Sequence, residues 1–251
     1  MTEPRVEDVK EWVDGAGRIA VLSGAGISTD SGIPDYRGPG GVWTTNPSAQ
    51  RMVTIADYLA DPEVRVAAWQ ERLHHPAWTA EPGPGHQALV ALERTGRLRA
   101  IATQNIDGLQ QAAGSDPRLV LELHGTLREA GCLSCGRRTP MREALDRVVA
   151  GEPDPACLAC GGLQRSATIA FGQSLDPEVL ATATAAARNS DLFIAVGTSL
   201  TVQPAANLCA VALDAGARLV IVNAQPTPYD TFAAAVLSAP IGEVLPALVG
   251  P

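Results

Sequence analysis

The sequence predicts an α/β fold, a doubly wound parallel sheet with a smaller module inserted into it. Three observations predict this fold. Short apolar runs alternate with segments of helical periodicity, which is the pattern of a parallel sheet covered by helices on both faces. A polar or glycine-rich motif follows most of the apolar runs. Two Cys-x-x-Cys pairs interrupt the alternation in the second half of the chain.

Apolar periodicity and turn residues define the expected elements. We expect a helix where apolar residues recur every three or four positions before a Gly or Pro, and a buried strand where about five apolar, often β-branched residues follow one another. In chain order these are a helix at 6–13, a strand at 18–22, broken helical segments at 46–75, a helix at 86–95, strands at 99–103 and 119–123, a helix at 176–188, a strand at 192–196, a helix at 204–215 and a strand at 218–222.

Length and composition restrict the class of protein. The chain has 251 residues, 46% of them hydrophobic, which fits one large unit with an insertion. It has no run of eighteen apolar residues, and residues 1–12 lack the apolar core of a signal peptide, so we expect neither a membrane span nor a leader. The net charge of −8 argues against nucleic acid as the main partner and is compatible with basic, lysine-bearing polypeptides.

The most informative stretch begins where the first strand ends and reads Ser-Gly-Ala-Gly-Ile-Ser over residues 23–28. Glycine has no Cβ, so the backbone N–H groups around Gly24 and Gly26 can approach a pyrophosphate at the carboxyl edge of the sheet. The dinucleotide fingerprint needs a third glycine at position 29, which is Thr29. The glycines alone therefore fit either a nucleotide site or a structural turn.

Two further strands are followed by polar side chains. Residues 103–107, Thr-Gln-Asn-Ile-Asp, are either a turn that caps the next helix or part of a ligand site. His124 directly follows the strand at 119–123, and its near-neutral pKa suits a general base. The other histidines, at positions 74, 75 and 86, are interpreted as structural.

Four of the five cysteines form two Cys-x-x-Cys pairs, separated by 21 residues, which is typical of a zinc site more than of a redox motif. Four thiolates close the coordination shell, so the metal would be structural. Reduced thiols that hold zinc also indicate a cytoplasmic protein. Cys209 lies in an apolar helix and is expected to be a small buried residue. The predicted ligands are Cys132, Cys135, Cys157 and Cys160.

Together these motifs resemble those of the sirtuins, the NAD-dependent protein-lysine deacylases. The resemblance rests on residues 24–28, 32–38, 103–107 and 124–125 and on later motifs at 169–173, 197–204 and 222–225, and it extends from about residue 20 to 248. By this resemblance, NAD would contact Gly24, Ala25, Gly26, Ser28, Asp35, Tyr36, Arg37, Gln104, Asn105, Asp107, Gly197, Thr198, Ser199, Asn223 and Gln225.

The resemblance also implies roles and domains. His124 would be the catalytic base, Asn105 would orient the ribose, and Asp107 would bind the nicotinamide carboxamide. Phe171 and Gly172 would contact the substrate peptide, next to a Gln173 where the family usually has Glu. We expect one catalytic unit over residues 1–251: a Rossmann-like NAD domain from residues 1–45, 76–127 and 168–251, and a small domain from a helical insertion, 46–75, and a zinc ribbon, 128–167.

The implied reaction breaks the bond between nicotinamide and ribose. The acyl oxygen of a modified lysine attacks the anomeric carbon, and His124 takes a ribose hydroxyl proton, so that nicotinamide, acyl-ADP-ribose and free lysine are formed. The partners would be proteins that carry acylated lysine, and neither a nucleic acid nor a membrane. Two alternatives remain open: a mono-ADP-ribosyltransferase on the same scaffold, and a non-enzymatic NAD sensor that docks a partner through its zinc ribbon.

The helical insertion also bears on the acyl group. Sirtuins that prefer succinyl or malonyl lysine carry a Tyr-x-x-Arg pair there, in which the arginine meets the acyl carboxylate. The corresponding region, residues 69–75, contains Arg72 but no tyrosine, and no Tyr-x-x-Arg pair occurs in the chain. We therefore expect a preference for acetyl-lysine.

Overall fold

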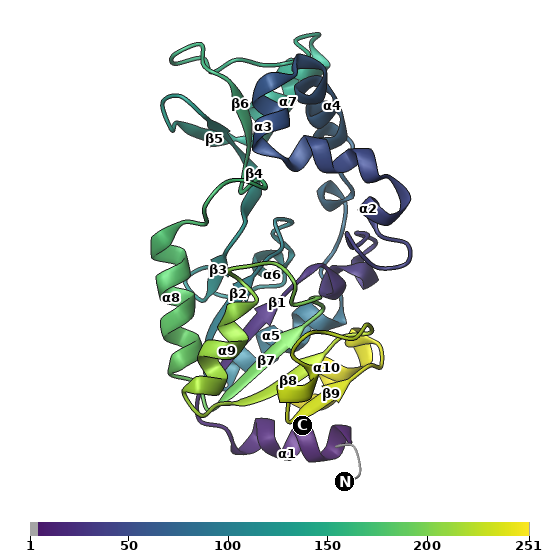
Figure 1. Cartoon of the computed structure of the whole chain (residues 1–251), viewed down its shortest axis with the longest axis vertical. Coiled ribbons are helices and arrows are strands. Elements are labelled where there is room, and N and C mark those ends of the chain that lie inside the picture. The colour runs from purple at the N-terminus through teal and green to yellow at the C-terminus, as the bar shows by residue number, and fades with distance from the viewer. Residues whose placement is uncertain (1–4, 251) are drawn as a thin grey trace.

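The protein is described from a computed structural model over residues 5–250 (Figure 1). No leader was expected from residues 1–12, and the first four of these residues lie outside the described residues. The larger part of the molecule contains a six-stranded sheet, in which all neighbouring strands are parallel and follow the order β3-β2-β1-β7-β8-β9. Its strands are β1 (Ile19–Ser23), β2 (Leu98–Thr103), β3 (Val120–Glu122), β7 (Leu192–Val196), β8 (Arg218–Val222) and β9 (Ala235–Leu237).

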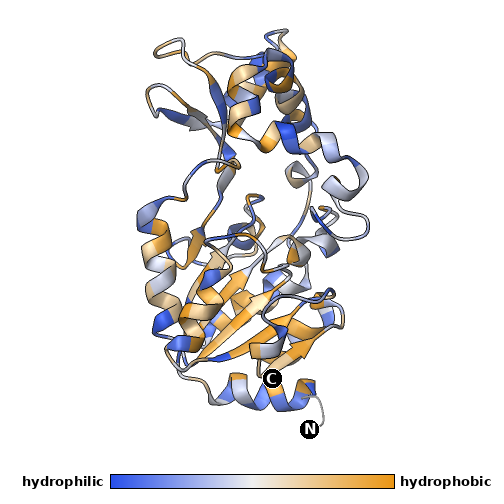
Figure 2. Ribbon diagram, in the orientation of Figure 1, coloured by the Kyte–Doolittle hydropathy of each residue, from blue (hydrophilic) through white to orange (hydrophobic). Residues whose placement is uncertain are grey.

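Helices cover both faces of this sheet, because its central strands are apolar on both sides. In β1, Ile19 and Val21 pack into one core and Ala20 and Leu22 into the other. The first core is closed by α1 (Val6–Gly15), α5 (Pro84–Arg94) and α10 (Ile241–Val249), and the second by α8 (Pro177–Arg188) and α9 (Asn207–Asp214). Figure 2 shows the strands as a continuous apolar layer. The predicted doubly wound α/β fold is confirmed.

A second, antiparallel sheet lies in the smaller part of the molecule, in the order β5-β4-β6 (Figure 1). Its strands are β4 (Gly125–Cys132), β5 (Arg138–Pro140) and β6 (Gln164–Thr168). The helices beside it are α2 (Val42–Thr45), α3 (Ile55–Ala60), α4 (Pro62–Leu73) and α7 (Met141–Val149), with a 3-10 helix, η2 (Pro47–Val53). Short helices also lie at η1 (Ala25–Ser31), η3 (Pro76–Trp78), α6 (Leu109–Ala112) and η4 (Asp230–Phe232).

The helical segment and the ribbon share a hydrophobic core. Trp69 of α4 packs with Ala130 of β4 and with Met141 and Leu145 of α7. Because these residues bury their apolar surface against one another, we propose that 46–75 and 128–167 form one small domain. Among residues 5–250, no helix is both long and apolar enough to span a lipid bilayer.

Several elements differ from the expectation. The helix expected at 204–215 begins at Asn207, after a series of turns. The elements that the periodicity did not predict include α7, β9 and α10. The apolar residues of α7 have helical spacing, so its signal was present in the sequence. By contrast, β9 has only three residues, and α10 contains Pro246, which reads as a helix breaker.

Candidate active site

The motifs that follow the strands gather at one edge of the parallel sheet. Because β3, β2, β1, β7 and β8 are neighbours and run in the same direction, their carboxyl ends form a single row. Backbone hydrogen bonds join adjacent members of the row: Gln104 N–H donates to Ser23 O (2.9 Å) and Gly24 N–H donates to Val196 O (3.0 Å). Nucleotides bind at such an edge in open α/β sheets.

The two glycines of the first loop are required by the loop after β7. A Cβ on Gly24 would lie 2.7 Å from the carbonyl oxygen of Gly197, and one on Gly26 would lie 2.7 Å from the Gly197 Cα. Gly26 N–H donates to this carbonyl (2.9 Å), and Gly197 has a φ of 60°, in the left-handed region. The glycines therefore let the loops that follow β1 and β7 pack closely, and this packing uses the N–H groups of Gly24 and Gly26 themselves.

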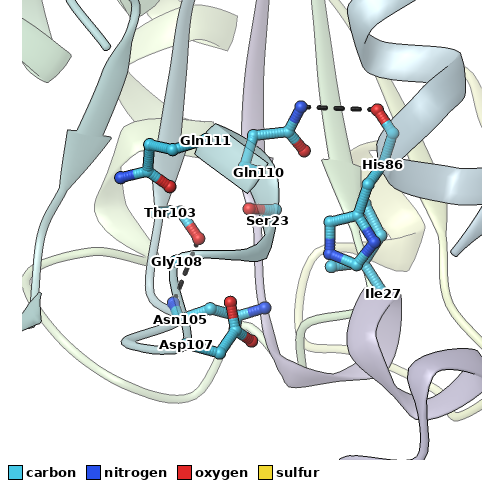
Figure 3. Close-up of a pocket in the computed structure, with 9 residues that line it drawn as sticks. All are labelled: Ser23, Ile27, His86, Thr103, Asn105, Asp107, Gly108, Gln110 and Gln111. Carbon is cyan, nitrogen blue, oxygen red and sulfur yellow. Dashed lines mark hydrogen bonds between the residues drawn. The ribbon is translucent and has the colours of Figure 1, made fainter. Parts of the chain in front are cut away.

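A buried polar network lies beside these loops and lines a small cavity (Figure 3). Ser28 Oγ donates to Asp107 Oδ2 (2.8 Å) and accepts from Asn105 Nδ2 (3.0 Å). The other Asp107 oxygen accepts the backbone N–H of Leu109 (2.9 Å), as a cap of α6. The Asp107 carboxylate thus accepts a backbone N–H at the start of α6 and also lines the cavity, while a ligand role for the Thr-Gln-Asn-Ile-Asp motif stays a prediction.

His86 completes this network, although the sequence indicated only a structural role. Its Nδ1 accepts the N–H of Gly83 (3.2 Å), so Nε2 carries the proton and points toward Ser28 Oγ at 3.4 Å. Burial lowers the pKa of His86, and nearby Asp107 opposes that shift. His86 and Asn105 come from α5 and from the loop after β2, on opposite sides of the cavity in Figure 3. No local signal in the sequence points to this pairing, because 58 residues separate His86 from Ser28.

His124 lies at the end of β3, beside the same row of loops. Its Nδ1 is 3.0 Å from the carbonyl oxygen of Gln104, so Nδ1 carries the proton and Nε2 keeps its lone pair. Burial lowers the pKa of His124 below its ordinary value of 6.5, and the hydrogen bond to Gln104 opposes this shift. A neutral imidazole with Nε2 available is the state that a general base requires.

The loop with Asp35, Tyr36 and Arg37 packs on an aromatic residue that the sequence analysis missed. The Trp43 ring lies 4.8 Å from the Tyr36 ring, 4.5 Å from the Arg37 guanidinium and 5.4 Å from the Phe171 ring. Asp35 Oδ1 closes the loop by accepting the Gly38 N–H (2.8 Å). Trp43 therefore connects the predicted cofactor loop with the predicted peptide segment.

The segment at 169–173 joins both parts of the molecule. Ile169 N–H donates to the carbonyl of His124 (2.8 Å), and Phe171 exchanges backbone hydrogen bonds with Val53 (2.8 Å) and Ile55 (3.0 Å). Gln173 Oε1 accepts from Ala170 N–H and from Arg165 Nη1, both at 2.9 Å. Phe171 remains 43% exposed, which leaves its side chain available to a ligand.

The remaining predicted cofactor residues lie farther along the row. Thr198 is buried and its Oγ1 accepts from Gln104 Nε2 (2.8 Å). Ser199 bonds to Thr201 (2.9 Å), and Asn223 Nδ2 donates to the Gln225 carbonyl (2.7 Å) at the end of β8. These residues lie at the same edge of the sheet as the Ser28–His86 network. Among residues 5–250, however, Ser199, Asn223 and Gln225 form no hydrogen bond with that network.

The four cysteines converge at the end of the small sheet, with all Sγ atoms within 4.8 Å of one another. The Sγ separations are 3.5 Å for Cys132–Cys160 and 3.8 Å for Cys135–Cys157. A tetrahedral zinc with Zn–S bonds of about 2.3 Å needs separations of about 3.8 Å, so the cluster fits this metal. Directly after the first Cys-x-x-Cys pair, Gly136 has a φ of 72°, in the left-handed region that favours glycine.

Comparison with known proteins identifies the family. The family model for the Sir2 family matches residues 24–204. The chain belongs to the Sir2 family. It is 54% identical to "NAD-dependent protein deacetylase 2" of Streptomyces coelicolor, over 92% of this chain and 96% of that protein. It is 42% identical to "NAD-dependent protein deacetylase 1" of Bradyrhizobium diazoefficiens, over 98% of this chain and 95% of that protein.

Solved Sir2 structures agree with this assignment. One described as "Sir2-p53 peptide-NAD+" superposes with a TM-score of 0.85 at 32% identity, and one described as "Sir2 bound to acetylated peptide" with 0.85 at 31%. Each comparison covers 96% of both chains. The sirtuin family expected from the motifs is therefore confirmed.

Proposed function

We propose that this Sir2-family chain is an NAD-dependent protein deacetylase with His124 as its general base. The activity and its NAD requirement rest on the family and on relatives that are named NAD-dependent protein deacetylases. The observation that carries the role of His124 is its hydrogen bond to Gln104, which fixes the neutral tautomer with Nε2 as proton acceptor at the ligand edge.

The chain's other residues would hold the reactants. NAD, when bound, supplies the ribose carbon that accepts the acyl oxygen and the nicotinamide that leaves. The backbone of the loops at Gly24–Gly26 and Gly197–Ser199 would bind its phosphates, and Asn223 with Gln225 its adenosine ribose. Asn105 and Asp107 offer a donor and an acceptor for the carboxamide, held in place by Ser28 and His86. Phe171 and Gly172 would contact the peptide that carries the acylated lysine.

We further infer a cytoplasmic enzyme that acts on proteins with acylated lysine. The four thiolates would hold one structural zinc, which a reducing compartment maintains. The net charge of −8 does not favour nucleic acid or an anionic membrane as partners.

Product analysis tests this function. An acetylated-lysine peptide incubated with the protein should lose its acetyl group only when NAD is present, and mass spectrometry should detect nicotinamide and acetyl-ADP-ribose in equal amounts. Transfer of labelled ADP-ribose to protein without loss of acetyl would instead identify a mono-ADP-ribosyltransferase. NAD binding without any product would identify a sensor.

The pH profile of the reaction should reflect the environment of His124. Because burial lowers the pKa of His124, it stays a neutral base to a lower pH than an exposed histidine. We expect kcat/KM to fall on the acid side with a midpoint below 6.5, measured with circular dichroism at each pH to exclude unfolding. A midpoint at or above 6.5 in a folded enzyme would contradict the assignment.

The acyl preference can be tested on one peptide sequence. Arg72 is buried, contacts Ser166 Oγ at 3.4 Å and lies 3.7 Å from Glu71, while Trp69 beside it has no hydroxyl to orient a carboxylate. We expect kcat/KM for acetyl-lysine to exceed that for succinyl-lysine by about tenfold or more, which corresponds to about 1.4 kcal/mol. Equal or reversed values would mean that a cation binds the acyl carboxylate.

A further inference from the structure

A second cavity lies in the smaller part of the molecule, between α4 and β6. It is lined by Tyr58, Trp69, Arg72, Arg165 and Ser166, together with Met52 and Ala68. The space between these side chains has room for one particle of about the size of a water molecule. The catalytic assignment uses none of these residues.

Arg165 brings an incompletely satisfied guanidinium to this cavity. The residue is 5% exposed, and its Nη1 donates to the Thr168 carbonyl (2.8 Å) and to Gln173 Oε1 (2.9 Å). Its Nε is buried and has no hydrogen-bond partner. Within residues 5–250, no carboxylate oxygen forms an ion pair with Arg165, since its polar partners are a carbonyl, an amide and a hydroxyl.

The second cation in the cavity is Arg72. Its Nη2 contacts Ser166 Oγ at 3.4 Å, and its carboxylate neighbour is Glu71, at 3.7 Å with its side chain 42% exposed. Asp154, the other acid near this core, already binds Arg65 Nε at 2.6 Å and Trp69 Nε1 at 3.3 Å. Burial and the neighbouring Arg72 both lower the pKa of Arg165, as expected for two like charges.

Buried charges are normally paired, because an unpaired ion loses its hydration without compensation. Here two guanidinium groups line one cavity, the acid beside Arg72 is the partly exposed Glu71, and the buried Arg165 Nε–H is unpartnered. Gln173 occupies a position from which a carboxylate would neutralise Arg165, but its amide supplies a hydrogen bond without charge. The missing charge must come from a ligand if the cavity is to be neutral.

We propose that this cavity binds a small monatomic anion, of the size and charge of chloride, between Arg72 and Arg165. Its size favours a halide over phosphate, sulfate or the carboxylate end of an acyl chain. A bound halide neutralises the cations that would otherwise attract an acyl carboxylate, in agreement with the expected acetyl preference.

The anion would also support the peptide segment. Arg165 holds the carbonyl of Thr168 and the side chain of Gln173, and Gln173 in turn accepts the N–H of Ala170. These contacts brace the backbone just before Phe171 and Gly172. Neutralising Arg165 therefore keeps in place the segment that would contact the substrate peptide, which makes Arg165 and Gln173 positioning residues.

Bromide is the probe for the test, because its anomalous X-ray scattering distinguishes it from water. Crystals of the full chain grown or soaked in sodium bromide should show an anomalous peak in contact with Arg165 Nε and Arg72. In solution, the melting temperature should rise by about 2–4 °C when chloride replaces gluconate at constant ionic strength. Neither measurement requires catalysis, so failure here is distinct from failure of the proposed deacetylase function.

Gln173→Glu provides the decisive variant, because it places a carboxylate beside Arg165 without changing the size of the side chain. We expect this variant to bind no bromide in the cavity and to lose the chloride-dependent rise in melting temperature. Gln50→Glu, which makes the same charge change at an exposed position, should retain both. A site that contains only water, an equal chloride effect in Gln173→Glu, or displacement of bromide by a succinylated peptide would overturn the proposal.

Discussion

His124→Ala should abolish deacetylation while the protein still binds NAD. The substitution removes the imidazole whose Nδ1 is bonded to Gln104 O and whose Nε2 would take the ribose hydroxyl proton. A positioned general base contributes about 10²–10⁴-fold to a rate, so kcat should fall by that factor. Turnover is measured on an acetylated peptide by mass spectrometry, and NAD binding by calorimetry.

His74→Ala is the matched control, because His74 is exposed on the protein surface and lies outside the network around Ser28 and Asp107. This variant should deacetylate at the wild-type rate. Wild-type turnover in His124→Ala would show that another group takes the proton. Loss of NAD binding in His124→Ala would show that the residue acts in binding and not as a base.

Replacing Cys132 or Cys157 by Ser should lower both zinc content and thermal stability. Each change removes one of four thiolates that lie within 4.8 Å of one another, and structural zinc sites contribute about 10–16 kcal/mol in isolated zinc-finger peptides. A chain of this size loses about 2–4 °C of melting temperature per kcal/mol. A drop of about 10 °C or more is therefore expected, with zinc measured by atomic absorption and activity falling as a consequence.

Cys209→Ala is the control for thiol removal. Cys209 is fully buried in α9, far along the chain from the cluster, and burial raises the pKa of its thiol to about 12. This variant should keep one zinc per chain, although it loses some packing. A cluster variant that lost its zinc yet kept the wild-type melting temperature would contradict a folding role for the metal.

Several features could be predicted from the sequence because local patterns dictate them. A run such as Ile19–Ser23 is apolar on both faces, and a strand of this kind fits only the centre of a covered sheet. Once the sheet is parallel, all its carboxyl ends meet at one edge, so the motifs at Gly24, Gln104, His124, Gly197 and Asn223 had to share that edge. The spacing of the cysteines likewise indicated their common ligand.

Other features had weak or contradictory local signals. The strand at Ala235–Leu237 is too short for a period to be counted, and Pro246 interrupts the pattern of the last helix. These elements form because α10 buries Val244, Leu245 and Leu248 against the sheet, and that packing outweighs intrinsic preference.

The sequence by itself determined the fold class, the ligand edge and the cysteine cluster, since each follows from the alternation of strands and helices or from the spacing of residues along the chain. Only the tertiary structure decided which distant side chains meet there. It brought His86 to Ser28 across 58 residues and placed Trp43 in contact with both the Tyr36 and the Phe171 ring. It also placed Arg72 in one cavity with Arg165. Such contacts depend on how whole helices and strands pack, and no local periodicity encodes that packing.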